Sequence, residues 1–322
     1  MTWFAWRQAR TVIMVALAAT AAVAVAAIAA GRAGGTLRLW LSVLVVVVPG
    51  LLGVFWGAPL VAGELESGSF RLAWTQDVSR TRWLGLRLAV SGLAAMAVAG
   101  LVSGLVTWWA GPLDRAAMDQ FGSFDSRGLV PVGYAAFAFA LGALIGALLR
   151  TTVPAMAVTL AGFTAVRVTF RLLGRPRLLP PVTRVLALNP ATTGYGSSGF
   201  LPLVPASSLQ PAAPHLPNAW VTSVAVVNRT GQGLTARVLT RTCPGVGRSH
   251  GGSAPGGHQQ APASVVNTMQ QCVTRLAVTY HEVVTYQPAG RYWTLQWLEL
   301  GVFLAAALLL AGACAWRVRR IG

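Results

Sequence analysis

The sequence predicts an all-α polytopic membrane protein with six transmembrane helices and a small α+β extracytoplasmic domain between helices five and six. Three observations support this fold class. Only 10% of the 322 residues are charged and 55% are hydrophobic, whereas a soluble domain carries about a quarter charged residues. Six stretches stay apolar over about the 20 residues that a helix needs to cross the hydrocarbon core. The segment before the last stretch is instead rich in Pro, Gly, Ser and Thr.

The expected spans follow the apolar stretches in chain order. They are residues 11–30, 39–61, 88–109, 129–149, 151–170 and 295–316. The fifth is the weakest, because its clean core runs only from Val153 to Val166 and Arg167 follows. Since a long arginine side chain can reach the interface, Arg167 is expected to snorkel there. The first apolar run is too long for a secretory signal, so we expect a retained helix.

These spans divide the chain into three parts. Residues 1–170 form the membrane domain, residues 171–291 the extracytoplasmic domain, and residues 292–322 the last span and a cytosolic tail. Before the first span, residues 3–10 mix aromatic side chains with arginine. This pattern is typical of a short amphipathic helix on the inner leaflet or of an aromatic belt, and both can hold together.

The distribution of arginine sets the orientation, because cytosolic loops carry an excess of positive charge. With the N-terminus inside, the arginines in cytosolic segments are Arg7, Arg10, Arg71, Arg80, Arg82, Arg87, Arg150, Arg317, Arg319 and Arg320. The short outside loops then hold only Arg32, Arg38, Arg115 and Arg127. We therefore expect a multi-pass plasma-membrane protein with both termini cytosolic and residues 171–291 extracytoplasmic.

The expected outer domain differs from the rest in composition. Val221–Asn228 and Thr235–Leu239 have the residue types of short strands, and the Gly- and Pro-rich run from Thr242 to Ala263 is typical of a flexible loop. Glu282 is the single acidic residue between Arg171 and Arg291, so the domain is basic. Membrane lipids with anionic headgroups are an expected partner on that ground.

Residue types exclude or disfavour several kinds of site. All 25 basic residues are arginine, so the Lys of a Walker-type phosphate loop is missing, and we expect no catalytic or cofactor-binding residues. The arginines flank spans instead of forming one stripe, which disfavours nucleic-acid binding. The four histidines and three cysteines match no zinc spacing, so no metal site is expected. Cys243 and Cys272 could form a disulfide outside the cell; the sequence leaves this pairing open.

A charge within a span is costly and usually functional, and Glu299 is the clearest case. It lies about one turn inside the outer boundary of the sixth span. One interpretation is a pair with Arg167 or Arg291. The interpretation that we favour is an interfacial carboxylate that reaches headgroup water.

The connection from Gly63 to Arg87 is too polar to face lipid and too long for a simple turn. Gly63 and Gly68 are expected to break the backbone, and Ser69 to cap a helix that begins at Phe70. Such a helix would lie across the membrane surface, where a soluble partner could grip it. On spacing alone, a solvated loop anchored by tryptophans explains the segment equally well.

Two motifs carry a family resemblance. The first is Glu64-Leu65-Glu66-Ser67-Gly68-Ser69-Phe70-Arg71-Leu72-Ala73-Trp74-Thr75-Gln76, followed by Val78-Ser79-Arg80. The second is Val284-Thr285-Tyr286-Gln287-Pro288-Ala289-Gly290-Arg291-Tyr292-Trp293, with Trp316-Arg317-Val318-Arg319-Arg320 after the last span. Both are similar to segments of ABC-2 type transporter permeases, most closely of the actinobacterial branch. The chain departs from that pattern at Asp77, where family members often carry Pro.

The resemblance implies a permease subunit whose loop docks as a coupling helix on cytosolic ATP-binding cassette ATPase subunits, which bind the ATP-Mg. The implied coupling residues are Glu64, Glu66, Gly68, Ser69, Arg71, Trp74, Arg80 and Arg82, and the turn Arg150–Thr152 is a smaller second contact. A second permease copy, identical or a paralogue, and efflux of an amphipathic or lipid-like compound are also implied. The alternative is a non-transporting receptor or sensor with a ligand-binding outer domain; an ion-coupled carrier is disfavoured by the few charges within the spans.

Overall fold

The computed structural model describes residues 35–67, 80–188, 216–242 and 263–320. The chain divides into two compact units. The first comprises Met1–Leu179 and Gly290–Gly322, and the second Pro180–Ala289. The predicted first span and the amphipathic segment before it lie outside the described residues.

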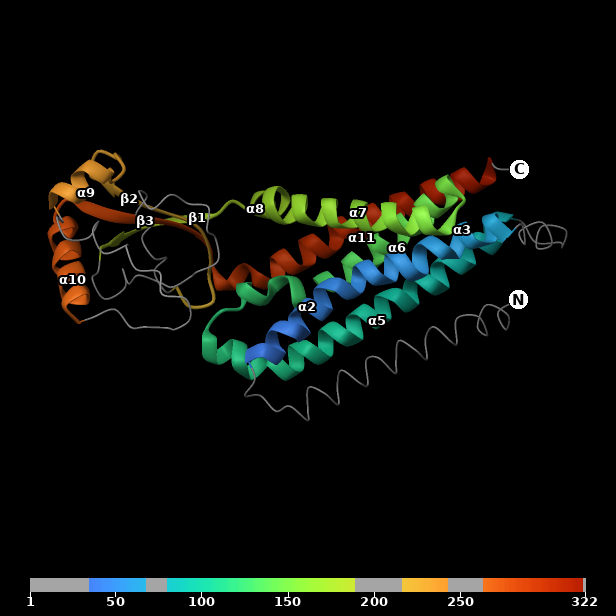
Figure 1. Ribbon diagram of the computed structural model, residues 1–322, viewed down its shortest axis with the longest axis horizontal. Coiled ribbons are helices and arrows are strands. Elements are labelled where there is room, and N and C mark those ends of the chain that lie inside the picture. The colour runs from blue at the N-terminus through green and yellow to red at the C-terminus, as the bar shows by residue number, and fades with distance from the viewer. Residues whose placement is uncertain (1–34, 68–79, 189–215, 243–262, 321–322) are drawn as a thin grey trace. The chain divides into compact units, whose positions relative to one another are not determined.

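The described part of the first unit is helical (Figure 1). Its elements are α2 (Gly35–Leu52), the π-helical turn η1 (Gly53–Gly57), α3 (Ala58–Ser67), α5 (Arg80–Ala117), the 3₁₀ helix η2 (Phe121–Ser126), α6 (Val130–Leu149), α7 (Thr152–Thr169), the π-helical turn η3 (Phe170–Gly174), α8 (Arg175–Leu178) and α11 (Tyr292–Arg319). The short 3₁₀ turn η4 (Ala289–Arg291) leads into α11.

Five helical segments of the described chain are long and apolar enough to cross a membrane. They are Leu39–Glu66, Gly85–Pro112, Val130–Leu149, Thr152–Leu178 and Ala289–Arg319. They correspond to the second to sixth predicted spans, which confirms the mostly helical, multi-pass part of the prediction. The fifth continues to Leu178, well beyond the predicted end at residue 170, because the helix passes through η3 and α8 without a break.

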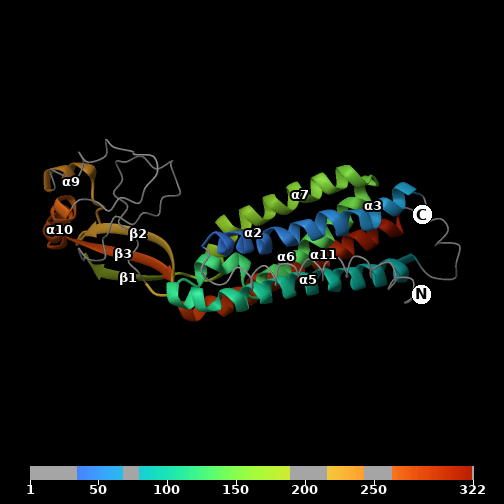
Figure 2. The same ribbon diagram turned by 60° about the horizontal axis from the view of Figure 1, so that its bottom comes forward.

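Helix α6 is the centre of the first unit. It contacts α2, α3, α5, α7 and α11, and these long helices lie side by side in Figure 1 and Figure 2. In its most apolar window 72% of the residues are buried, against 17% for the span that contains α7. Lipid cannot drive apolar helices together, so close van der Waals packing between small residues has to hold such a centre.

The packing of α6 depends on two facing pairs of glycines. A Cβ added at Gly142 would lie 2.8 Å from the Ala58 nitrogen, and one at Gly146 would lie 2.5 Å from the Ala58 carbonyl oxygen. On the opposite side, a Cβ at Gly57 would lie 2.5 Å from the carbonyl oxygen of Phe139. The fourth member, Gly53, meets Ala138 in the same way. The two backbones are therefore in direct contact where the π turn η1 crosses α6.

The second unit has a three-stranded antiparallel sheet with the order β1–β3–β2. The strands are β1 (Val182–Ala187), β2 (Trp220–Asn228) and β3 (Tyr280–Gln287), and the helices are α9 (Ala236–Thr242) and α10 (Ala263–Ala277). Val283 in the central strand pairs with Val185 on one side and Ala225 on the other. Val273 of α10 packs with Leu188 and Val226, so this helix covers the sheet.

The predicted strand at Val221–Asn228 is confirmed as β2, but the one at Thr235–Leu239 is wrong, because residues 236–242 form helix α9. Strand pairing ends just before it, where the Leu234 amide donates to the Val226 carbonyl at 2.9 Å. The predicted strand contains two β-branched residues, Thr235 and Val238, although its alanine, arginine and leucine are good helix formers.

Replacing Gly142 with Ala should force the contact between η1 and α6 apart. We expect a loss of about 1–3 kcal/mol in the free energy of unfolding, as for other overpacked cores. Gly104→Ala on α5 is the matched control, because no atom lies within 4 Å of a Cβ added there. Thermal unfolding in detergent measures both. Equal midpoints for the two variants would contradict the close contact.

Candidate functional site

The segment predicted to couple to a partner is helical at both ends. Helix α3 continues through Gly63 to Ser67, so the expected backbone break at Gly63 is wrong. Leu65 packs against the buried cluster around Trp56 and Leu88, and this burial outweighs the low helix propensity of a glycine. Glu64 and Glu66 therefore lie on the last turns of a membrane-spanning helix and not in a loop.

Glu66 contacts the beginning of the fifth span. Its carboxylate accepts hydrogen bonds from the Thr152 backbone N–H at 2.9 Å and from the Thr152 hydroxyl at 2.6 Å. Helix α7 begins at Thr152, and its N-cap residue Thr151 makes no capping hydrogen bond of its own. A carboxylate from α3 thus caps α7, where the helix dipole favours negative charge.

Glu64 makes a second link at this end of the bundle. Its carboxylate forms an ion pair with Arg87 of α5, and both side chains are largely buried. The turn between α6 and α7 is closed by Arg150, which adopts the left-handed conformation with φ of 57°. The end of α3 is therefore tied to α5 through Glu64 and to α7 through Glu66.

Of the other predicted coupling residues, the structure describes only two. Arg80 and Arg82 lie in the first turns of α5. Gly68, Ser69, Arg71 and Trp74 lie outside the described residues. The structure thus brings Glu66 together with the turn that was predicted as a separate, smaller contact. Whether either touches an ATPase stays a prediction.

The metal and disulfide expectations concern residues that are mostly outside the described part. Cys243, His215, His250 and His258 are not described, so the pairing of Cys243 with Cys272 stays a prediction. Cys272 itself is buried in α10 beside Leu276. Within the described ranges, no group of three or more His, Cys, Asp and Glu residues is placed to hold a metal ion.

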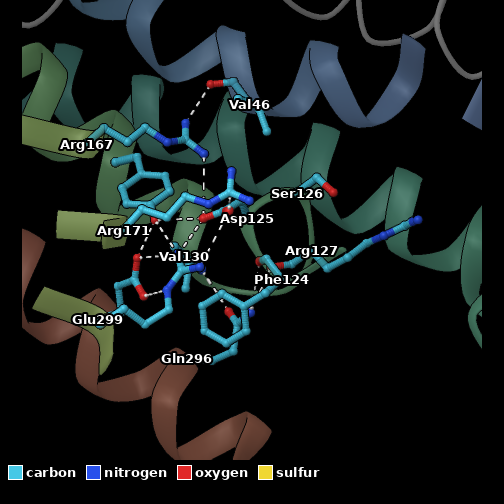
Figure 3. A network of polar contacts seen from close by, with 12 residues as sticks. Val46, Phe124, Asp125, Ser126, Arg127, Val130, Arg167, Arg171, Gln296 and Glu299 are labelled. Carbon is cyan, nitrogen blue, oxygen red and sulfur yellow. Dashed lines mark hydrogen bonds and ion pairs between the residues drawn. The ribbon is translucent and has the colours of Figure 1, made fainter. Parts of the chain in front are cut away.

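The opposite end of the bundle contains a largely buried ion network that we did not predict from the sequence (Figure 3). Asp125 lies in η2, between α5 and α6. Three arginines spaced four residues apart, Arg167, Arg171 and Arg175, direct their guanidinium groups to its carboxylate. Burial by itself raises the pKa of the Asp125 carboxyl, but the charges of these arginines outweigh burial and hold it below its usual range.

Arg175 is the link between the two carboxylates of the network. Its Nε donates to Glu299 Oε2 at 2.9 Å, and its Nη2 donates to Glu299 Oε1 at 3.0 Å. Nη2 also donates to Asp125, and the guanidinium lies 4.4 Å from the centre of the Phe124 ring. Tyr134 on α6 donates its hydroxyl to Glu299. The fork of one arginine therefore joins η2, α6, α8 and α11.

This geometry corrects the interpretation of Glu299. Its side chain is 0% exposed, so it does not reach headgroup water, and its cation is Arg175 and not Arg167 or Arg291. Arg167 does not snorkel either. Its Nη1 donates to the Val46 carbonyl at 2.7 Å, and its guanidinium lies 4.2 Å from the centre of the Tyr134 ring.

Gln296, one turn before Glu299 on α11, caps the start of α6. Its Oε1 accepts from the backbone N–H groups of Leu129 at 2.9 Å and Val130 at 3.0 Å. Its Nε2 donates to the carbonyls of Phe124 at 3.3 Å and Arg127 at 3.2 Å. One buried amide thus satisfies backbone groups of η2 and α6 that lipid would leave unpaired.

The sequence contained a signal for this network. Arginines at steps of four begin near the end of the predicted fifth span, and an acid precedes the fourth span. The signal was missed because the span was expected to end at residue 170, which placed Arg171 and Arg175 in the outer domain. Arg175-Pro176 was interpreted as a turn, whereas the helix continues through the π turn η3 to Leu178.

Residues 30–175 match the family model described as ABC-2 membrane transporter related. The chain is a membrane protein related to ABC-2 transporter permeases. No curated protein and no solved structure matches it. The matched region contains the links of Glu64 and Glu66 and the three arginines of the ion network. Domains of this kind are typical of non-catalytic permease subunits and imply ABC ATPase partners in general.

In this ABC-2 related chain, Arg175→Gln should strongly destabilise the bundle. The change leaves Glu299 buried without a cation, which costs about 3–5 kcal/mol in other proteins. Glu299→Gln should cost a similar amount, and the double variant should cost less than the sum of the two. Arg177→Gln is the control, because Arg177 is exposed and donates only to the Leu173 carbonyl among the contacts described. Thermal unfolding in detergent tests this; additive single effects would contradict the pair.

Proposed function

We propose that this chain is the permease subunit of an ATP-binding cassette exporter whose ATP is hydrolysed by separate cytosolic subunits. The family match of residues 30–175 supports the permease class. The observation that carries the coupling mechanism is the pair of hydrogen bonds from Thr152 to Glu66. They join the end of the proposed coupling segment to the start of the fifth span.

The contacts of α3 give the mechanism a physical route. Closure of the ATPase subunits would push on the segment between Glu64 and Arg82. Displacement of α3 is passed to α7 through the Glu66 cap and to α5 through the pair of Glu64 with Arg87. Three spans therefore respond to one push, and the substrate leaves outward or laterally.

The remaining features of the proposal rest on the resemblance and on charge. Arginine distribution supports cytosolic termini and an extracytoplasmic second unit. A second permease copy, identical or a paralogue, completes the assembly, and the motif likeness points to the actinobacterial branch. An amphipathic or lipid-like substrate is proposed by family analogy. ATP-Mg binds to the partner subunits and not to this chain.

Glu64→Ala combined with Glu66→Ala should abolish substrate-stimulated ATPase activity of the reconstituted complex. Asp119→Asn at the opposite end of the bundle is the matched control and should leave activity unchanged, because its carboxylate binds only the Gly122 amide among the described contacts. Thr152→Val removes the hydroxyl bond to Glu66 and should lower stimulation while the ATPase still co-purifies. Full stimulation in the double variant would contradict the coupling role.

The proposed orientation predicts the result of cysteine labelling in intact cells. A cysteine at Ser69 should be protected from a membrane-impermeant maleimide, whereas one at the exposed Arg229 in the second unit should react. The parent chain gives the background of the native cysteines. Modification at position 69 with protection at 229 would mean that the chain lies in the opposite orientation.

A further inference from the structure

The ion network carries one more positive charge than negative charge. Three guanidinium groups, those of Arg167, Arg171 and Arg175, face the carboxylates of Asp125 and Glu299. Two of the arginines are enclosed: Arg175 binds both acids, and Arg167 binds the Val46 carbonyl. The excess positive charge therefore lies nearest the surface at Arg171, whose side chain is 67% exposed. Its Nη1 lies 3.4 Å from Asp125 Oδ2, an oxygen that Arg175 also contacts.

The surface around Arg171 is apolar. Val168, Leu172 and Leu173 are all strongly exposed, and they belong to the same stretch of α7 and η3. Exposing three apolar side chains together to water is unfavourable, whereas contact with lipid acyl chains has no such cost. An arginine on a lipid-facing surface needs a polar partner, because an unpaired charge in hydrocarbon is costly.

The depth of Arg171 corresponds to the headgroup boundary. Val153 is the first strongly exposed apolar residue of α7, and about 20 residues of helix from there reach Leu172. Exposed tryptophans at the same end of the neighbouring helices support this level, since tryptophan concentrates at membrane interfaces. They are Trp40 on α2, Trp108 on α5, and Trp293 and Trp297 on α11.

We propose that Arg171 binds the phosphate of an anionic phospholipid, with the acyl chains lying along Val168, Leu172 and Leu173. The planar guanidinium fork matches two phosphate oxygens, and the excess charge of the network favours a lipid with a net negative charge over a zwitterionic one. The ligand would complete the charge balance of the network from outside. This site is independent of the proposed transport function, because it needs only the membrane depth of η3.

The test is lipid binding by the purified full-length chain in detergent. Native mass spectrometry and thermal unfolding follow titration with phosphatidylglycerol, with phosphatidylcholine and with inorganic phosphate. The wild type should bind phosphatidylglycerol more tightly than phosphatidylcholine and gain stability from it. Arg171→Gln should weaken the phosphatidylglycerol site about tenfold, the scale of one charge-assisted contact. Arg177→Gln removes the same charge six residues further along the chain and should leave the affinity within about twofold.

Three results would overturn the proposal. They are equal wild-type affinity for the two lipids, equal losses in the Arg171 and Arg177 variants, and competition by inorganic phosphate at the lipid's own concentration, which would indicate a free-anion site. Arg171→Lys guards against a folding defect in the glutamine variant. It keeps the charge without the fork and should bind with an affinity between those of wild type and Arg171→Gln.

Discussion

Charge that is enclosed away from water must be matched inside the protein, and this constraint determines one end of the bundle. Asp125 is its central group. Without its carboxylate, Arg167 and Arg175 would lose the acid that they share, and Arg171 would lose its ion pair with Asp125. Asp125 lies in η2, between α5 and α6, and it binds Arg167 of α7. It also binds Arg175, which in turn binds Glu299 of α11. These contacts therefore join the ends of α5, α6, α7 and α11. The buried amide of Gln296 adds the hydrogen bonds that hold η2 and α6 in register.

The opposite end combines the largely buried ion pair of Glu64 with Arg87 and an exposed contact. Glu66 is exposed, and its bonds to Thr152 compete with water, whereas Arg175 and Glu299 are enclosed. Exposed polar contacts contribute little to stability and exchange partners readily. The glycine contact of η1 with α6 lies between the two ends and depends on close packing of the two backbones.

The sequence predicted what depends on composition and missed what depends on contact. Spans two to six follow from apolar length, because few other structures satisfy the backbone in lipid. The helical path through Gly63 could not be predicted, since it depends on Leu65 reaching a cluster built by other helices. The charge of Glu299 within a span was recognised as costly. Its partner Arg175 was assigned to the outer domain, so their ion pair was not predicted. The helix at residues 236–242 was missed because β-branched residues at its start were taken to favour a strand. In the structure, strand pairing ends at Leu234 and the helix follows.

Helix α7 connects these two ends of the bundle and is the least enclosed of the long helices. Its first turn is held by Glu66, and its last turns, through η3 and α8, are held by the carboxylates of the network. Between these points few of its residues are buried, so most of its length adjoins lipid and not protein. Helix α7 is thus held at both ends, by Glu66 and by the carboxylates of the network. Displacement of α3 would therefore reach the Asp125 network through α7, and the strength of that network decides whether the far end follows or holds.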